Sequence, residues 1–254
     1  MVKQENTLYR IAKVIAPIIV FLIVFGGLEW AIGHYDVPRW LISKPSDTVQ
    51  VLFDKFGEIW PNVWVTIKEI LIGYVIGISL GISMALLFTS NRFAEKAVSP
   101  YVVFLIVTPQ IILVPLLMLW MGFGIEVKFT AVALSSFPIT MISTMTGVKN
   151  VSAHRYELMK SLRATKLQTF FKVLIPSAIP NVFTGMRLAT IFATTAAVGA
   201  ELISGNIGIG PQISYYTEFM QVDIAFAYVY MMMLISVLFY TLIGFIENMI
   251  LKRR

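Results

Sequence analysis

Residues 224–246, IAFAYVYMMMLISVLFYTLIGFI, contain no charged side chain along their whole length. An α-helix needs about 20 predominantly apolar residues to cross the hydrocarbon core of a bilayer. The run therefore predicts a membrane helix, and five similar runs precede it: 14–33, 70–88, 97–121, 129–148 and 182–203. We expect an all-α polytopic membrane protein with about six transmembrane helices in a single domain, residues 1–254.

The composition of the chain also indicates a lipid environment. Hydrophobic residues make up 57% and charged residues 13%, whereas a soluble domain carries about 25% charged residues. There is no cysteine, and the two histidines lie far apart in the sequence, so neither thiolate chemistry nor a metal site is predicted. The first apolar run follows several basic residues but is longer than the core of a signal peptide, so we interpret it as a retained helix.

The distribution of Lys and Arg predicts the orientation, because cytoplasmic loops carry an excess of these residues. Most of the 20 Lys and Arg residues lie before the first run, after the second and fourth runs, and after the sixth. The segment between the fifth and sixth runs has none. Alternate loops are therefore basic, which predicts an even number of crossings with both termini in the cytoplasm. This topology accounts for the net charge of +6 without a nucleic acid partner.

Prolines and polar residues interrupt several of these runs. We expect Pro109 and Pro115 to break the third helix and Pro138 to break the fourth, because proline removes a backbone donor. Such breaks are tolerated where the backbone is buried in protein or lines a wet cavity. Kinked packing and a translocation pathway both remain open. The candidate pathway residues are Thr108, Pro109, Gln110, Trp120, Thr194, Thr195 and Glu201.

Two glycine patterns suggest close backbone contacts. Gly73, Gly77 and Gly81 share one face of the second run, which predicts a face that meets protein rather than lipid. Glu201 stands before the loop 204–211, SGNIGIGP, which lacks the Gly-Lys-Ser/Thr of a phosphate loop. Glu201 either contacts lipid headgroups or water at the membrane boundary, or takes part in gating or substrate binding.

The basic segment 149–176 predicts two short amphipathic helices. Thr165-Lys166-Leu167-Gln168 is a capping-box pattern that begins the second helix, and Pro176 disfavours its continuation. The segment is either a surface element that lies on lipid or a docking element for a soluble partner. The apolar residues are Leu158, Met159 and Leu162 in the first helix and Leu167, Phe170, Phe171 and Leu174 in the second.

Three parts of this segment match one pattern: Glu157-Leu158-Met159, Ser161-Leu162-Arg163-Ala164-Thr165 and Val173-Leu174-Ile175-Pro176. The pattern resembles the EAA loop of bacterial binding-protein-dependent ABC importer permeases. Arg163 replaces the family glycine that usually permits the turn between the two helices, so we expect Ala164 or Thr165 to make this turn.

Further similarities at residues 45–49, 73–74, 115–124 and 185–187 extend the resemblance to about residues 43–250. They are typical of the branch that serves nitrate, sulfonate and taurine, or thiamine-pyrimidine and riboflavin-type substrates. Glu69 stands where this branch often has arginine. The sequence leaves the solute open.

The resemblance implies a type I ABC importer permease fold in the bacterial inner membrane. Two permease copies, expected here as a homodimer, would bind a cytoplasmic ATPase dimer and receive a small solute from an extracytoplasmic binding protein. ATP and Mg²⁺ would belong to the ATPase, so we expect no catalytic residue and no cofactor in this chain. The alternative is a secondary transporter or channel without an ATPase. The residues implied in coupling are Glu157, Leu158, Met159, Leu162, Arg163, Ala164, Val173, Ile175 and Pro176.

Overall fold

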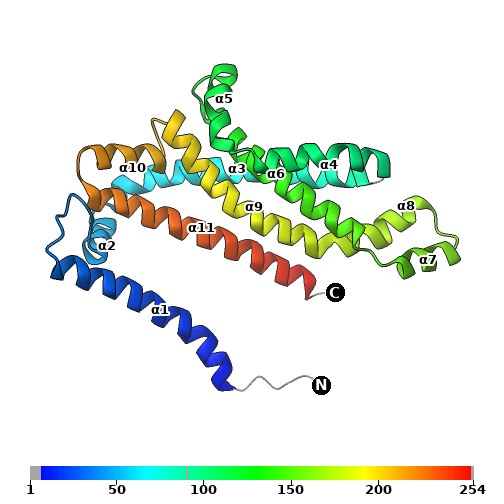
Figure 1. Cartoon of the computed structure of the whole chain (residues 1–254), viewed down its shortest axis with the longest axis horizontal. Coiled ribbons are helices and arrows are strands. Elements are labelled where there is room, and N and C mark those ends of the chain that lie inside the picture. Colours follow the sequence, from blue (N-terminus) through cyan, green and yellow to red (C-terminus); the bar gives the residue numbers. More distant parts are fainter. Residues whose placement is uncertain (1–6, 90, 253–254) are drawn as a thin grey trace. The chain divides into compact units, whose positions relative to one another are not determined.

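The structure is a computed structural model that describes residues 7–89 and 91–252 (Figure 1). Every regular element in this part of the chain is helical. Lys3, Arg253 and Arg254, on which the predicted orientation partly rests, lie outside it. The elements are α1 (Thr7–His34), α2 (Pro45–Asp54), α3 (Phe56–Thr89), α4 (Arg92–Val107), η1 (Gln110–Leu113), α5 (Val114–Met121), α6 (Ile125–Lys149), α7 (Ala153–Ser161), α8 (Lys166–Thr169), η2 (Phe170–Leu174), α9 (Ile175–Ser204), α10 (Ile209–Glu218) and α11 (Val222–Leu251).

Within the described residues, four helices are long and apolar enough to cross a membrane. They are α3, α6, α11 and the continuous helix Lys166–Ser204, which joins α8, η2 and α9. Helix α4 and the η1–α5 segment are bent by 89° and form a fifth span if they are taken as one broken crossing. The apolar part of α1, Ile18–His34, is shorter. The expected all-α polytopic architecture is confirmed.

Only one of the three expected proline breaks occurs among the described helices. The chain leaves helical geometry at Thr108 and Pro109, between α4 and η1. Pro115 lies in the first turn of α5, where its missing N–H removes no intrahelical hydrogen bond. Pro138 lies inside α6, which stays continuous, so the predicted break there is wrong. Helix α6 is the most buried of the four spans, and surrounding protein supports the helix at its proline.

The chain divides into two compact units. The first comprises the described residues up to Trp60 together with Gln212–Tyr230. In this unit the Glu29 carboxylate accepts hydrogen bonds from the Ser46 amide at 3.0 Å and the Ser46 hydroxyl at 2.6 Å. Lys44 at the N-cap supplies no side-chain acceptor. Glu29 therefore caps α2 from a distant part of the sequence and fixes this helix on α1.

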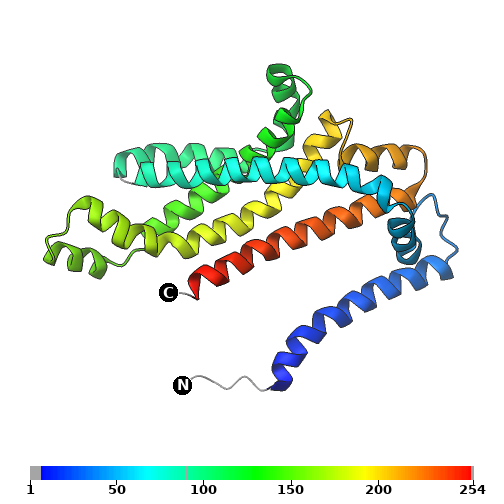
Figure 2. The ribbon, with the colours of Figure 1, turned by 180° about the vertical axis from the view of Figure 1, so that it is seen from behind.

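The second unit, Pro61–Pro211 with the residues from Met231, is built on close packing of α3 and α6. Figure 2 shows α3 crossing over α6 and α9. A Cβ added at Gly73 would lie 2.3 Å from the Phe129 carbonyl oxygen, and one at Gly77 would lie 2.7 Å from that of Ala133. Because neither distance admits a side chain, the glycine face packs directly on α6, as the sequence predicts.

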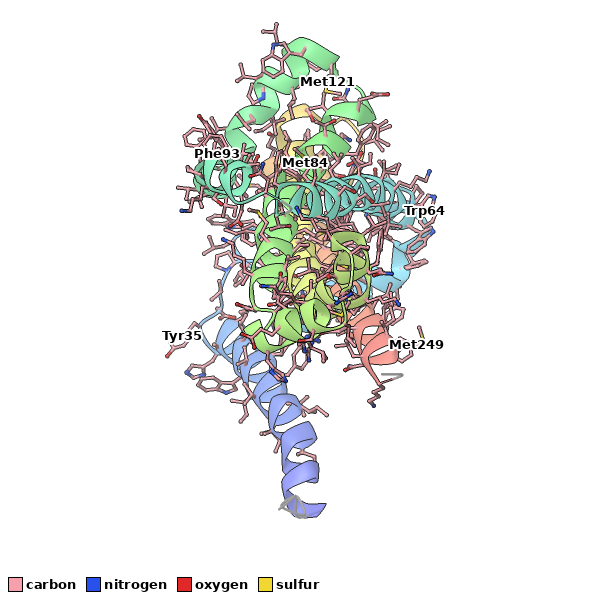
Figure 3. The ribbon with its side chains drawn as sticks, turned by 90° about the vertical axis from the view of Figure 1, so that its right-hand side faces the viewer. Tyr35, Trp64, Met84, Phe93, Met121 and Met249 are labelled. Atoms are coloured by element: carbon pink, nitrogen blue, oxygen red, sulfur yellow. The ribbon has the colours of Figure 1, made fainter. Side chains whose placement is uncertain are left out.

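Helix α5 is anchored at one end and projects at the other. Val114 and Leu117 are buried with Ala131 of α6 and Ala200 of α9. The far end, around Met121, extends away from the packed helices (Figure 3). Trp120 there is 71% exposed. The η1–α5 segment thus presents an apolar surface that the second unit leaves uncovered.

Candidate functional site

Helix α7 ends in a left-handed turn at Arg163, whose φ is 52°. The Arg163 amide donates to the Lys160 carbonyl and the Ala164 amide to the Met159 carbonyl, both at 3.0 Å. These two bonds form a Schellman ending, in which the residue after the cap is usually glycine. The prediction that Ala164 or Thr165 makes the turn is therefore wrong, because Arg163 adopts the glycine-like conformation itself.

The second short helix begins with the predicted capping box. The Thr165 hydroxyl accepts from the Gln168 amide at 3.2 Å, and the Gln168 side chain accepts from the Thr165 amide at 2.9 Å. Pro176 does not end this helix, contrary to prediction. It lies in the first turn of α9, directly after the π-helical turn η2. The wider turn accommodates the proline ring, which in a regular α-helix would clash with the Lys172 carbonyl.

The two short helices expose apolar side chains and enclose a groove of about 690 Å³. Leu162 at the C-cap of α7 is 67% exposed and Leu167 on α8 is 70% exposed. Leu158 and Phe171 are also exposed. The groove is lined by Thr89, Tyr156, Lys160, Ala164, Lys166, Leu167, Thr169, Phe170 and Leu174. Its lysines give an otherwise largely apolar surface a positive charge.

The structure places the predicted coupling residues in two groups. The exposed residues on α7 and its turn are Glu157, Leu158, Leu162 and Arg163. Met159, Ala164, Val173, Ile175 and Pro176 are partly buried, the last three where the segment enters α9. The first group can contact a partner directly, whereas Val173, Ile175 and Pro176 connect the segment to the membrane helix.

The predicted pathway residues are not gathered in one place. Thr108, Pro109 and Gln110 lie together at the break after α4, where the Gln110 amide donates to the carbonyls of Leu105 at 2.7 Å and Thr108 at 3.2 Å. These bonds satisfy carbonyl groups that the ending helix leaves unpaired. The remaining residues lie apart: Trp120 on the projecting α5, Thr194 buried in α9, Thr195 exposed on α9, and Glu201 near the end of α9.

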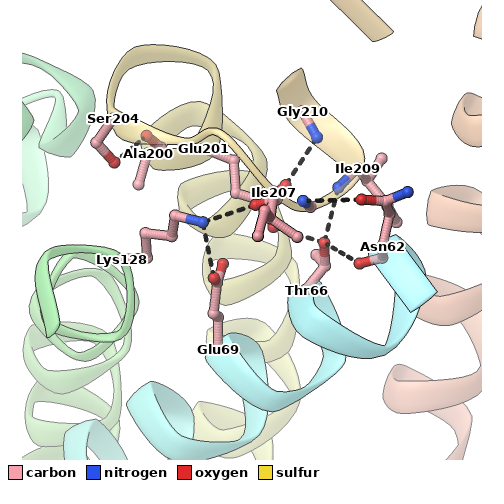
Figure 4. Close-up of polar contacts among 11 residues, drawn as sticks. Asn62, Thr66, Glu69, Lys128, Ala200, Glu201, Ser204, Ile207, Ile209 and Gly210 are labelled. Carbon is pink, nitrogen blue, oxygen red and sulfur yellow. Dashed lines mark hydrogen bonds and ion pairs between the residues drawn. The ribbon is translucent and has the colours of Figure 1, made fainter. Parts of the chain in front are cut away.

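Glu201 is fully buried and bonded to protein (Figure 4). Its carboxylate accepts from the Thr66 hydroxyl at 2.5 Å and from the Gly210 amide at 2.7 Å. The Lys128 ammonium is also buried, and it donates hydrogen bonds to the Glu69 carboxylate at 2.9 Å and to the Ile207 carbonyl at 2.8 Å. We call Thr66, Glu69, Lys128 and Glu201 the buried charge cluster. Glu201 is therefore enclosed by protein groups rather than exposed at the surface of the second unit.

The glycines of the 205–210 loop are explained by their proximity to Glu201. Gly208 has a φ of 128°, and a Cβ added there would lie 2.2 Å from a Glu201 carboxylate oxygen. A Cβ on Gly210 would lie 2.8 Å from the Glu201 Cβ. Larger residues would push the loop away from the carboxylate, so the glycines allow it to enclose Glu201.

Three members of the buried charge cluster, Thr66, Glu69 and Lys128, were not predicted as site residues. Glu69 and Lys128 each stand directly before a predicted apolar run, 70–88 and 129–148. A lysine and a glutamate at the edges of separate apolar runs suggest a buried pair, but the sequence does not state which residues meet. Among the described residues, no three His, Cys, Asp or Glu side chains are arranged to hold a metal ion.

A second ion pair joins α9 to α11 within the second unit. The Arg187 Nε lies 3.3 Å from a Glu247 carboxylate oxygen, and the guanidinium lies 5.3 Å from the centre of the Tyr240 ring. Arg187 crosses α11 at Gly244, where an added Cβ would lie 2.6 Å from a guanidinium nitrogen. Arg187, which lies within the predicted apolar run 182–203, is therefore paired with a carboxylate.

Comparison with known proteins gives one consistent family. Residues 77–254 match the family described as binding-protein-dependent transport system inner membrane component. The chain is 30% identical over 252 residues to the formylaminopyrimidine transport permease protein ThiX of Halalkalibacterium halodurans, covering 96% of this chain and 98% of ThiX. It is 28% identical over 198 residues to the putative aliphatic sulfonates transport permease protein SsuC of Bacillus subtilis, covering 78% and 72% of the two chains.

Two solved structures share the fold. A crystal structure of an amino acid ABC transporter with histidines superposes with a TM-score of 0.65 at 16% identity, over 78% of this chain and 97% of that chain. An inward-facing form of the MetNI methionine ABC transporter gives 0.53 at 21% identity, over 77% and 93%.

Proposed function

Since this chain belongs to the family of inner membrane components of binding-protein-dependent transport systems, we propose that its 157–176 segment couples it to a cytoplasmic ATPase. The chain is a permease subunit of an ABC importer and is not itself an enzyme. We place both termini in the cytoplasm, and ATP and Mg²⁺ on the partner ATPase.

The observation that carries this proposal is the exposed apolar surface of the segment from α7 to η2. Leu158, Leu162, Leu167 and Phe171 are all more than half exposed. Burial against a partner would stabilise the contact by roughly 25 cal/mol for each Å² of apolar area removed from water. The surrounding cations favour an acidic partner surface, and Glu157 would pair with a cationic or amide group there.

The helix that leaves this segment supports transmission of movement. Residues Lys166–Ser204 form one continuous helix, with the π-helical turn η2 inside it. A displacement of the docked end must therefore move the part of α9 that lies in the membrane. The partly buried Val173, Ile175 and Pro176 occupy the connection.

The translocation pathway is assigned to the broken helix after α4 together with a second copy of this chain. An irregular backbone at membrane depth requires cover by protein or by a water-filled cavity. The break at Thr108–Gln110 and the exposed apolar η1–α5 segment would receive that cover at the axis of a homodimer. Trp120 would then face the second copy or the pathway rather than lipid, and Thr194 and Thr195 would lie nearer that axis than the acyl chains.

A small organic solute, delivered by an extracytoplasmic binding protein, is the proposed cargo. ThiX matches over nearly its whole length, and its name assigns it formylaminopyrimidine. A small pyrimidine is therefore the first ligand to test on the cognate binding protein, and an aliphatic sulfonate the second.

The coupling proposal is tested with Leu162→Asp in the reconstituted transporter. We expect normal membrane insertion, with loss of ATPase co-purification or ATP hydrolysis that no longer drives uptake. Val49→Asp on α2 likewise replaces an exposed aliphatic side chain with aspartate, but outside the segment, and should leave ATPase association unchanged. Normal assembly and uptake in Leu162→Asp would reject the proposal.

A further inference from the structure

The buried charge cluster joins three membrane helices to one loop. Thr66 and Glu69 lie on α3, Lys128 lies on α6 and Glu201 lies on α9. The loop between α9 and α10 closes over them (Figure 4). All these residues belong to the second compact unit.

The 205–210 loop comprises the connection 205–208 and the first two residues of α10, and its backbone is bonded by side chains of α3, α6 and α9. The Ile209 amide donates to the Thr66 hydroxyl at 3.0 Å, and the Gly210 amide donates to Glu201 at 2.7 Å. Lys128 donates to the Ile207 carbonyl. Loops usually run over the surface and satisfy such groups with water. Here Ile207, Ile209 and Gly210 take their partners from buried side chains of α3, α6 and α9.

The Ser204 end of the Lys166–Ser204 helix is therefore held by more contacts than the Lys166 end. At Ser204 the chain enters the loop that the buried charge cluster holds. At Lys166 the helix borders the 690 Å³ groove and carries exposed side chains. It also contains the π-helical turn η2, an irregularity that often occurs at functional sites.

We infer that Thr66, Lys128 and Glu201 anchor the 205–210 loop to α3 and α6, so that the Ser204 end of the Lys166–Ser204 helix is a fixed pivot. The Lys166 end then moves about it. Glu201 acts as a positioning residue through the loop and touches no solute. The anchoring is independent of the proposed function, whereas the direction of movement rests on coupling to an ATPase.

The anchoring is tested by amide hydrogen exchange on the full chain in nanodiscs, without an ATPase. Thr66→Val keeps the side-chain shape and removes the hydroxyl that joins Glu201 to the Ile209 amide. We expect exchange of residues 207–210 to accelerate at least tenfold. Thr195→Val is the matched control, because this exposed hydroxyl bonds to the Ile191 carbonyl of its own helix. Wild-type exchange in Thr66→Val overturns the inference.

A second, independent test changes the charges of the cluster with one single and one double variant. Lys128→Met leaves Glu69 and Glu201 buried with no ammonium among the cluster residues, so we expect a lower melting temperature. Adding Glu69→Gln removes one of the two charges and should recover much of the loss, while the 207–210 amides still exchange faster than in wild type. No recovery of the melting temperature, or wild-type exchange in the double variant, contradicts the anchor.

The pivot is tested in the complete transporter by spin-label distances. The chain has no native cysteine, so two cysteines can be introduced at chosen positions and labelled for each distance. The distance between residues 72 and 206 should stay constant between the nucleotide-free and ATP-bound states, while that between residues 72 and 172 changes. Equal changes in both distances overturn the pivot. If the chain does not associate with an ATPase, the proposed function is rejected. The anchoring of the 205–210 loop is then still tested by the hydrogen-exchange experiment, which uses no ATPase.

Discussion

Replacing Arg163 with glycine should stabilise the turn between α7 and α8. Arg163 has a φ of 52°, and a left-handed conformation costs a residue with a side chain roughly 1–2 kcal/mol. Glycine avoids that strain but loses more chain entropy on folding, about 0.5–1 kcal/mol in regular elements. The free energy of opening the turn should therefore rise by about 0.5–1 kcal/mol, which corresponds to a two- to fivefold decrease in the equilibrium constant for opening.

Hydrogen exchange of the Arg163 and Ala164 amides measures this opening, because both donate the hydrogen bonds of the turn. Arg163→Ala is the control, since it removes the charge and keeps the strain. We expect Arg163→Gly to exchange two- to fivefold more slowly than Arg163→Ala and to assemble with its ATPase normally. Faster exchange in the glycine variant, or equal rates in the two variants, would refute the strain argument.

Three further predictions follow from packing, pairing and topology. Gly77→Ala should lower stability by about 1–3 kcal/mol because its Cβ would press on the Ala133 carbonyl, whereas Gly57→Ala, with open space around it, should change the melting temperature little. Glu247→Gln should lower the free energy of unfolding by about 1–3 kcal/mol, because Arg187 loses the carboxylate that it pairs with. An unchanged melting temperature would show that this ion pair does not stabilise the fold. A cysteine at Asn206 should react with an impermeant reagent from outside the cell, and labelling from the cytoplasmic side alone would reverse the topology.

Local patterns in the sequence predicted much of the fold. Run length and low charge predicted the four helices that are long and apolar enough to cross a membrane, whereas the apolar part of α1 is shorter than the predicted first span. The Thr165–Gln168 pattern predicted the start of α8, and the glycine face of α3 predicted its packing side. Each of these features depends on residues that are close in sequence. The family resemblance predicted a coupling role for residues 157–176, and both that role and its partner contacts stay a prediction.

Features that depend on tertiary contacts or on irregular backbone were missed. Pro138 and Pro176 fit within helices because surrounding packing and a π-helical turn accommodate them, which proline content alone does not reveal. Arg163 adopts an unfavourable φ that its residue type argues against. The burial of Glu201 was also missed, because its partners, Thr66 and the 205–210 loop, meet it only in the fold.

The length of the Lys166–Ser204 helix makes it a mechanical lever. Its 39 residues extend ~58 Å at 1.5 Å per residue, about twice the thickness of the hydrocarbon core. With one end fixed, a tilt of only ~5° would displace the other end by ~5 Å, comparable to one helical turn. A small tilt of the helix near Ser204 and a large displacement of its Lys166 end would then be one motion, whose amplitude grows with distance from the fixed end.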